Sequence, residues 1–409
     1  MITRIAWKNI WFKPLNTALS IILLTASVAI ITLLILLQEQ FEKQFDSNID
    51  NIDLVLGAQG SPLQLILSAV YQVDAPTGNI DYTEAKTWMK HRFVQTAVPL
   101  AFGDNYKGFR IVGTTPNYLT VYGKGIKEGR SFLKNFEVVV GSAIAAKMNL
   151  KIGDKFFGSH GDAAQGELHE DHEYIVTGIA TPTGKVADNL ILCTIPSVWA
   201  MHEEEGHEHA EAEEHSHEHH EEAITEQGKE ITAVLIKFRS KMGIIMWPRL
   251  IAQNTKMQAA SPAIEINRLF SLFGVGLQAL QYLAYGIMFI SGISIFIALY
   301  NTLKERKYEF ALLRVNGASR LQLLWLVLIE SLLLCITGFI FGTVVGRVAL
   351  TFISCSSESE FKMSFNPLEF VWQKEGYLFG LTIFVGILAA VIPAVKAYSL
   401  NISKTLANA

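Results

Sequence analysis

Residues 269–303 read LFSLFGVGLQALQYLAYGIMFISGISIFIALYNTL and contain no charged side chain over 35 positions. A helix needs about 20 apolar residues to cross the hydrocarbon layer of a bilayer, which is about 30 Å thick. The stretch is therefore long enough for a membrane span and for a helical extension beyond it. We place the span at residues 275–300.

Three further stretches have the same character. Residues 18–37 and 376–395 are free of charge, and residues 322–350 are interrupted only by Glu330 and Arg347. The first stretch is too long for a signal peptide and lacks a clear cleavage site, so we interpret it as an uncleaved anchor. Charged residues make up 18% of the chain, below the roughly 25% of soluble domains. The net charge of −4 offers no basic excess for binding nucleic acid.

The distribution of basic residues gives an orientation, because Lys and Arg accumulate in short cytoplasmic loops. With four spans, three basic segments fall on one side of the membrane: residues 1–17, 301–320 and 396–409. Both termini are therefore expected in the cytoplasm. Residues 38–268 and the loop 351–375 are expected on the other side.

Residues 38–268 are numerous enough to bury their own core, as two subdomains. Short patterns bounded by glycine and turn residues predict strands at 109–113, 137–141, 155–158, 174–178 and 233–238. Helices are predicted at 38–51, 63–70 and 142–148. Arg130 is expected to form a local salt bridge. The predicted fold class is a membrane α-helical protein with four transmembrane helices, 1+3, and a large α+β extracytoplasmic domain between helices 1 and 2.

A histidine-rich loop, residues 202–222, reads HEEEGHEHAEAEEHSHEHHEE. With almost no apolar side chain it has little to bury, so we do not expect it to fold by itself. Imidazoles and carboxylates bind first-row metals, and candidate ligands for zinc or another divalent metal are His202, His207, His209, His215, His217, His219 and His220. An acidic solvated insertion and a pH sensor remain alternatives.

The loop after the second predicted span begins LKERKYEFALLRVNGASR, at residues 303–320. Its pattern predicts a short amphipathic helix over residues 305–314 and a break at Asn316 and Gly317. Apolar contacts are expected from Phe310, Leu313 and Val315. Such a helix along the cytoplasmic face is a docking element for a soluble partner; an ordinary interfacial connector is the alternative.

The same loop resembles the FtsX/MacB-like permease family of ABC systems, the type VII or mechanotransmission transporters, which include lipoprotein-releasing and macrolide-export permeases. The family pattern E-R-x-x-E-x-x-x-L-R-x-x-G-A is matched at Glu305, Arg306, Glu309, Leu313, Arg314, Gly317 and Ala318. Phe310 and Ala311 stand where the family often has Ile-Gly. Further segments resemble the family at residues 6–17, 112–118, 128–130, 140–142, 153–154, 392–398 and 401–406.

The resemblance implies a homodimer of permeases bound to ABC ATPase subunits at the cytoplasmic face, with ATP on the partner subunit. This chain has no G-x-x-x-x-G-K-[ST] motif and is expected to be non-catalytic. The implied function is to couple ATP hydrolysis to movement of the periplasmic domain, for export or extraction of an envelope substrate. A periplasmic partner protein and membrane lipids are further expected contacts.

Two other functions remain open: a metal-ion (zinc) transporter with the histidine-rich loop as collector, and a membrane-anchored metal-binding sensor. The four predicted spans contain no histidine or aspartate, which disfavours the transporter. A substrate or proton pathway through Glu330 and Arg347 is a further alternative, although we expect no buried charged partner from the other spans and Arg347 is expected to snorkel.

Three glycines in the third span, Gly338, Gly342 and Gly346, repeat at every fourth position. They form one smooth helix face suited to close helix packing. The sequence does not decide whether that face packs within the chain or across a dimer.

Overall fold

The long apolar stretches form helices that group apart from the remaining residues. The computed structural model describes residues 14–159, 168–205, 228–360 and 365–399. The chain divides into two compact units, which we name the helical bundle (Met1–Glu42 and Leu272–Ala409) and the inserted domain (Lys43–Ser271).

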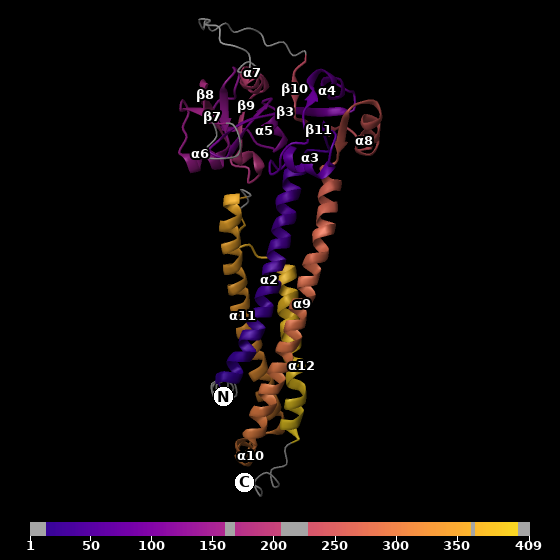
Figure 1. The fold of residues 1–409 in the computed structure, drawn as a ribbon. Helices are drawn as coiled ribbons and strands as arrows, with labels where there is room; N and C mark the ends of the chain where they lie inside the picture. Colours follow the sequence, from indigo (N-terminus) through magenta and orange to yellow (C-terminus); the bar gives the residue numbers. More distant parts are fainter. Residues whose placement is uncertain (1–13, 160–167, 206–227, 361–364, 400–409) are drawn as a thin grey trace. The chain divides into compact units, whose positions relative to one another are not determined.

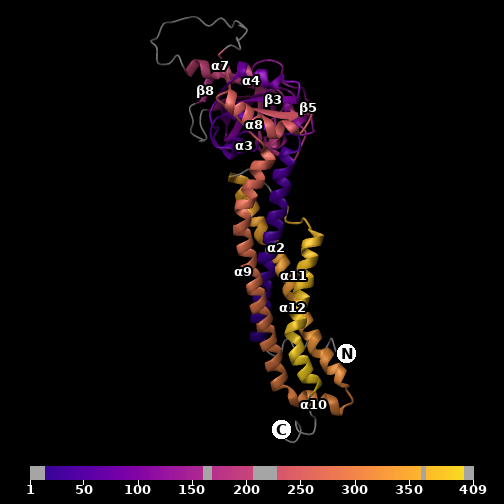
Figure 2. The ribbon, with the colours of Figure 1, turned by 90° about the vertical axis from the view of Figure 1, so that its right-hand side faces the viewer.

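The helical bundle is built on four long helices: α2 (Pro14–Ile49), α9 (Pro262–Glu305), α11 (Arg320–Glu360) and α12 (Trp372–Tyr398). A short helix, α10 (Lys307–Val315), links α9 to α11 (Figures 1 and 2). Among the described residues these four helices alone are long and apolar enough to cross a membrane. The predicted number of spans is therefore confirmed.

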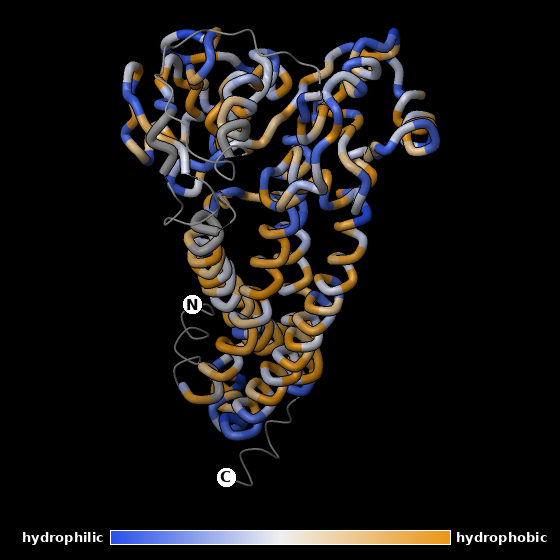
Figure 3. Tube along the Cα trace, turned by 45° about the horizontal axis from the view of Figure 1, so that its top comes forward, coloured by the Kyte–Doolittle hydropathy of each residue, from blue (hydrophilic) through white to orange (hydrophobic). Residues whose placement is uncertain are grey.

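The bundle has its own apolar core, with side chains from all four long helices. Its buried members include Leu24, Val28, Ile31, Met288, Ile295, Leu326, Leu334, Ala389 and Ala390. Large apolar side chains also cover the outward faces, among them Phe289, Ile340 and Phe384. Figure 3 shows this hydrophobic colouring along the four helices. Helices that are apolar on all sides match a lipid environment, where each backbone group is satisfied within its own helix.

The three glycines of α11 pack against α2 of the same chain. A Cβ atom added to Gly338 would lie 2.6 Å from a methyl carbon of Leu24, and one added to Gly342 would lie 2.5 Å from Cβ of Val28. One added to Gly346 would lie 2.8 Å from a backbone oxygen of α2. The glycine face of α11 therefore packs within the chain, which the sequence alone did not decide.

Arg347 has a buried charged partner, whereas the sequence analysis expected none from the other spans. Its Nη2 lies 2.8 Å and 2.9 Å from the two carboxylate oxygens of Glu375, in the first turn of α12. The Glu375 side chain is only 1% exposed. The prediction missed this partner because the two residues are 28 positions apart and Glu375 falls just before the predicted fourth span.

The inserted domain is an α+β domain, as predicted. The described strands are β1 (Leu54–Ala58), β2 (Ile80–Asp81), β3 (Val94–Tyr106), β4 (Phe109–Thr114), β5 (Ile126–Gly129), β6 (Glu137–Val140), β7 (Lys155–Ser159), β8 (Leu168–Ala180), β9 (Ile191–Thr194), β10 (Glu230–Ile231), β11 (Ala233–Phe238) and β12 (Met257–Ala260). The helices are α3 (Pro62–Ala69), α4 (Tyr82–Met89), α5 (Tyr118–Val121), α6 (Ser142–Met148), η1 (Val186–Asn189), α7 (Ile195–Glu205) and α8 (Met242–Asn254).

Strand β3 joins the two halves of this domain. The large sheet has the order β12-β1-β11-β3-β4-β9-β6-β8-β5, while β7 pairs with both β3 and β8. Part of the sheet consequently forms a closed ring of strands, in the order β3, β4, β9, β6, β8 and β7. The strands β12, β1 and β11 continue outward from β3, and the small β2–β10 pair is separate. One apolar core, which includes Leu56, Ile111, Val138 and Ile236, runs through both halves.

Glycine is needed where strands β5, β6 and β8 meet their neighbours. Gly129 has a φ of +80°, and a Cβ there would lie 2.2 Å from the carbonyl oxygen of Thr177. A Cβ on Gly141 would lie 2.3 Å from the carbonyl oxygen of Asp188. These glycines belong to segments that resemble the family, so at these positions the resemblance reflects backbone geometry.

The predicted salt bridge of Arg130 is confirmed. Its guanidinium donates to both carboxylate oxygens of Glu137, at 2.7 Å and 2.5 Å. The same carboxylate accepts the backbone N–H groups of Leu133 and Lys134. The hydrogen bond from Arg130 is the main reason that the pKa of Glu137 falls to about 2.

Candidate functional site

The loop that carries the most specific sequence motif folds as a helix held between two breaks. Helix α9 ends at Glu305, Arg306 adopts a non-helical conformation, and α10 begins at Lys307. At the other end Gly317 has a φ of +93°, and the N–H of Ala318 donates to the carbonyl of Leu313 at 3.0 Å. This left-handed glycine after the last turn is a common helix stop. The break at Asn316 and Gly317 occurs where the sequence predicts it.

One face of α10 is anchored in the bundle. Phe310 and Ala311 are buried, and Leu313 packs against the same apolar core. Phe310 and Ala311 are the two residues that depart from the usual family pattern. Because their side chains are buried within this chain, the departure affects how α10 is seated on the bundle.

Two arginines of the motif make contacts within the loop. Arg306 Nε donates to Glu309 Oε2 at 2.7 Å, and a second guanidinium nitrogen reaches the same oxygen. Arg314 Nη1 donates to the carbonyl oxygen of Ala318 at 2.7 Å, across the turn that ends α10. Both arginines therefore shape the loop, and Glu309 takes part through its pair with Arg306.

The opposite face of α10 is exposed and apolar. Tyr308, Leu312 and Val315 are 51%, 46% and 61% exposed, and their spacing places them on one helix face. Glu305 and Glu309 are exposed beside them. The sequence analysis missed Tyr308 and Leu312, although their i, i+4, i+7 spacing with Val315 was visible. The apolar contacts expected of Phe310 and Leu313 are made with the bundle core, whereas Val315 faces outward.

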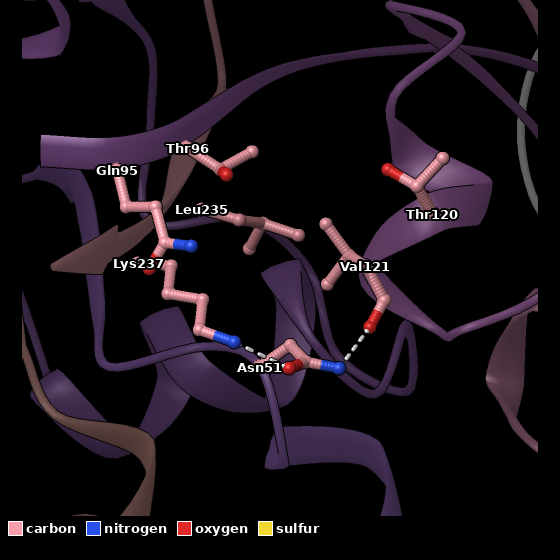
Figure 4. A pocket seen from close by; sticks show the side chains of 7 residues that line it. All are labelled: Asn51, Gln95, Thr96, Thr120, Val121, Leu235 and Lys237. Atoms are coloured by element: carbon pink, nitrogen blue, oxygen red, sulfur yellow. Dashed lines mark hydrogen bonds between the residues drawn. The ribbon is translucent and has the colours of Figure 1, made fainter. Parts of the chain in front are cut away.

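The inserted domain contains a small polar cavity of about 100 Å³. Figure 4 shows Asn51 between Lys237, whose Nζ donates to it at 2.6 Å, and the carbonyl of Val121, which accepts from it at 2.7 Å. A second, more open cavity of about 230 Å³ lies beside Trp199 and Thr232. Pockets for drug-sized ligands usually measure about 300–1,000 Å³. Neither cavity is therefore a convincing binding site for such a substrate.

The histidine-rich loop is largely outside the described residues. His202 belongs to α7, but its side chain is not described, and His207, His209, His215, His217, His219 and His220 lie outside the described chain. Within the described residues, His, Cys, Asp and Glu side chains form no group of three or more that could hold a metal ion. The described histidines have structural contacts instead: His91 packs edge-on against Trp247, and His172 stacks on Phe136.

Two known protein families match this chain, each over a different range of residues. Residues 17–237 match the MacB-like periplasmic core domain, and residues 282–402 match the FtsX-like permease C-terminal domain. Curated protein sequences gave no match.

Two solved structures are similar to about half of this chain. The periplasmic region of MacB from Actinobacillus actinomycetemcomitans has 13% identity and a TM-score of 0.36, with 54% of this chain and 95% of that one covered. The extracellular domain of the noncanonic ABC-type transporter YknZ from Gram-positive bacteria has 12% identity and a TM-score of 0.32, with 51% and 99% covered.

Four apolar helices with a large α+β domain between the first and second along the chain are the arrangement of an integral membrane protein, and the FtsX-like match places it in the permease class. The MacB-like model alone covers more than half of the residues. The chain belongs to the family of FtsX/MacB-type ABC transporter permeases.

Proposed function

We propose that this chain is the non-catalytic permease subunit of an ABC transporter and that a separate ATPase docks on α10. The observation that carries the proposal is the two-sided character of α10. Phe310 and Ala311 fix the helix to the bundle, while Tyr308, Leu312 and Val315 face outward beside exposed acidic residues. An exposed apolar stripe with charges beside it is suited to a protein partner.

The ATPase-coupling residues are Glu305, Arg306, Glu309, Leu313, Arg314 and Gly317, in two roles. Glu305 and Glu309 contribute to the docking surface, whereas the other four hold α10 in place. Movement of α10 would pass through Arg306 into α9, which is continuous from Glu305 to Pro262 and so reaches into the inserted domain. ATP hydrolysis on the partner would thereby move the inserted domain, for export or extraction of an envelope substrate, with a periplasmic partner protein as an additional component.

We place the protein in the bacterial cytoplasmic membrane with both termini and α10 in the cytoplasm. Support comes from Lys and Arg, which gather in the two terminal segments and in the α9–α11 connection. The inserted domain then lies in the periplasm, in agreement with the name of the MacB-like periplasmic core domain that it matches.

The proposed assembly is a homodimer of permeases, and the length of the apolar surface of α9 supports it. The charge-free run of residues 269–303 would be roughly 52 Å long as a helix, against about 30 Å of hydrocarbon. If the cytoplasmic end is fixed by Lys304 and Arg306, the excess lies outside the bilayer. There Leu272, Phe273 and Leu280 are exposed, and a second copy would remove them from water.

The docking proposal is tested with Leu312→Asp, which places a charge on the outward stripe without touching the buried face. Leu133→Asp, at an exposed leucine of the inserted domain, is the matched control. We expect Leu312→Asp to reduce the ATPase that co-purifies from mild detergent at least about tenfold, which corresponds to about 1.4 kcal/mol. The control should leave it unchanged. Unchanged co-purification with Leu312→Asp, in a protein that melts like the wild type, would remove α10 as the docking element.

We further propose that the histidine-rich loop binds zinc or another divalent metal, on the strength of its seven imidazoles. Zinc titration of the full chain and of a variant lacking residues 202–222 tests this. Several equivalents should bind to the full chain and be lost with the deletion. Equal binding by both proteins would contradict the assignment. Zinc flux in proteoliposomes without any ATPase would instead favour a metal-ion transporter, and absence of a co-purifying ATPase would favour a membrane-anchored sensor.

A further inference from the structure

Residues 365–371, the described part of the connection between α11 and α12, contact α2 within the helical bundle; we refer to them as the α11–α12 connection. Phe365 forms a small apolar cluster with Leu36 of α2 and Leu350 of α11. Its ring centroid lies 5.0 Å from that of Phe41. The contact is at the last part of α2 that belongs to the bundle, because the chain passes into the inserted domain after Glu42.

Gln40 adds a directional contact at the same point. Its Nε2 donates to the carbonyl oxygen of Asn366 at 2.8 Å, and its Oε1 accepts from the N–H of Asn366 at 2.7 Å. Gln40 is buried. One side chain thus satisfies both backbone groups of one residue, as a neighbouring strand would, and this fixes the position of α2 along the connection.

The connection itself is held firmly to α11 and α12. Ser354 Oγ accepts from the N–H of Phe365 at 2.8 Å and donates to its carbonyl oxygen at 3.2 Å. The buried Glu375 carboxylate holds Arg347 and also accepts from the N–H of Val371. Separating a buried, hydrogen-bonded ion pair is strongly unfavourable, so these contacts hold the connection to α11 and α12.

The contacts with α2 are of a kind that can be released. Amide hydrogen bonds contribute little net free energy, because water replaces them when they open. The neighbouring ion pair, Lys374 Nζ to Glu39 Oε2 at 2.8 Å, is partly exposed and weak for the same reason. Further along α2, the glycine face of α11 makes contacts that do not depend on bond direction.

We propose that Gln40, Asn366, Glu39 and Lys374 form a releasable latch that holds α2 to the α11–α12 connection and to the first turn of α12, and that its opening lets α2 shift along the glycine face of α11. The structure has the latch closed. Because α2 continues to Ile49 and into the inserted domain, opening would free that domain to move. The opening step rests on the proposed function, since ATP turnover on the partner would drive it.

Hydrogen exchange of the full chain, measured by mass spectrometry in lipid nanodiscs, tests the latch without nucleotide or partner. Gln40→Met keeps side-chain length but removes both hydrogen bonds. Gln38→Met is the control, because Gln38 is exposed and bonds only to Glu42 in the described chain. We expect the peptide that covers residues 365–371 to exchange at least about tenfold faster in Gln40→Met and to be unchanged in Gln38→Met. Equal exchange in both variants would overturn the latch.

The opening step is tested in the complex with the ATPase. Vanadate-trapped nucleotide should raise exchange at residues 365–371 of the wild type toward the Gln40→Met level, with exchange of α10 as the internal control. If α10 responds and residues 365–371 do not, the latch is static and the opening step is wrong. If α10 does not respond either, the proposed ATPase coupling has failed and the opening step fails with it, while the closed latch is still judged from the two variants without nucleotide.

Discussion

Helices α9 and α11 are similar in length and apolarity, yet three of the four glycines of α9 lie on an open surface whereas all three glycines of α11 are packed. Three glycines of α11 bring its backbone against α2, with an added Cβ at each position closer than 3 Å to an atom of α2. In α9, a Cβ added to Gly274, Gly276 or Gly286 would have no heavy atom of the described chain within 4 Å outside its own stretch of helix, whereas one added to Gly292 would lie 2.8 Å from a methyl carbon of Val385 in α12. Glycine in an apolar helix therefore does not by itself identify a packed face. In α11 it does, whereas three glycines of α9 lie on an open surface of the described chain.

The largest expected effect comes from filling the α11 face. Gly342→Leu forces a side chain into the space of Val28, and overpacking costs about 1–3 kcal/mol or more. We expect a fall of several degrees in the melting temperature in detergent. Gly276→Leu, on the open face of α9, is the matched variant and should melt within about 1 °C of the wild type. If both variants melt alike, the contrast between the two helices is wrong.

A smaller effect is expected on the open surface of α9. Leu272→Ser combined with Phe273→Ser removes two exposed apolar side chains that the proposed homodimer would bury. Self-association measured by light scattering in detergent should weaken about tenfold, or about 1.4 kcal/mol. The melting temperature of the monomer should stay the same. Undiminished association would show that α9 is not the contact between copies.

The smallest effect is a pH dependence confined to the inserted domain. The folded pKa of Glu137, about 2, lies below its ordinary value of 4.5, so the folded state binds this proton less readily than the unfolded state. The stabilisation is therefore present above pH 4.5 and disappears as the pH falls toward 2. Glu137→Gln should lower the melting temperature by less than about 3 °C at pH 7.

The difference between Glu137→Gln and the wild type should shrink below pH 4. Melting curves from pH 3 to 7 provide the measurement, and a difference that grows on acidification would contradict the sign. The bundle variants retain Glu137, so their difference in melting temperature from the wild type should not change with pH. This result would distinguish the inserted domain from the helical bundle.

The sequence analysis predicted the elements whose structure is determined by nearby residues. The four helices followed from uninterrupted apolar length, and strands such as Ala233–Phe238 and the helix Ser142–Met148 followed from their bounding turn residues. The long shared strand β3 was missed. It contains Pro99 and Gly103, both of which argue against a central strand. The pairing of Pro99 with Val234 is decided by the rest of the sheet.

The candidate site was also predicted only in part, because contacts between residues distant in the sequence determine the rest. The motif in the loop identified α10 and its glycine stop. Which side of α10 faces outward depends on the bundle to which it is fixed, and the sequence analysis did not distinguish Phe310 and Leu313, which pack in the bundle core, from the outward-facing Val315. The pairing of Arg347 with Glu375 and of Gln40 with Asn366 joins residues 28 and 326 positions apart. Nothing in the local sequence of either residue indicates such a partner.

The attachment of the two longest helices to the inserted domain has a mechanical consequence. Helix α2 leads into β1 and α9 follows β12, and these two strands are antiparallel neighbours with Val55 opposite Ala260. Both helices are thus joined to the same end of one ladder. Pulling the two helices apart would break the hydrogen bonds between β1 and β12 one after another. A joint displacement would distribute the force over these hydrogen bonds together. The β1–β12 ladder would therefore resist a joint displacement of α2 and α9 better than their separation.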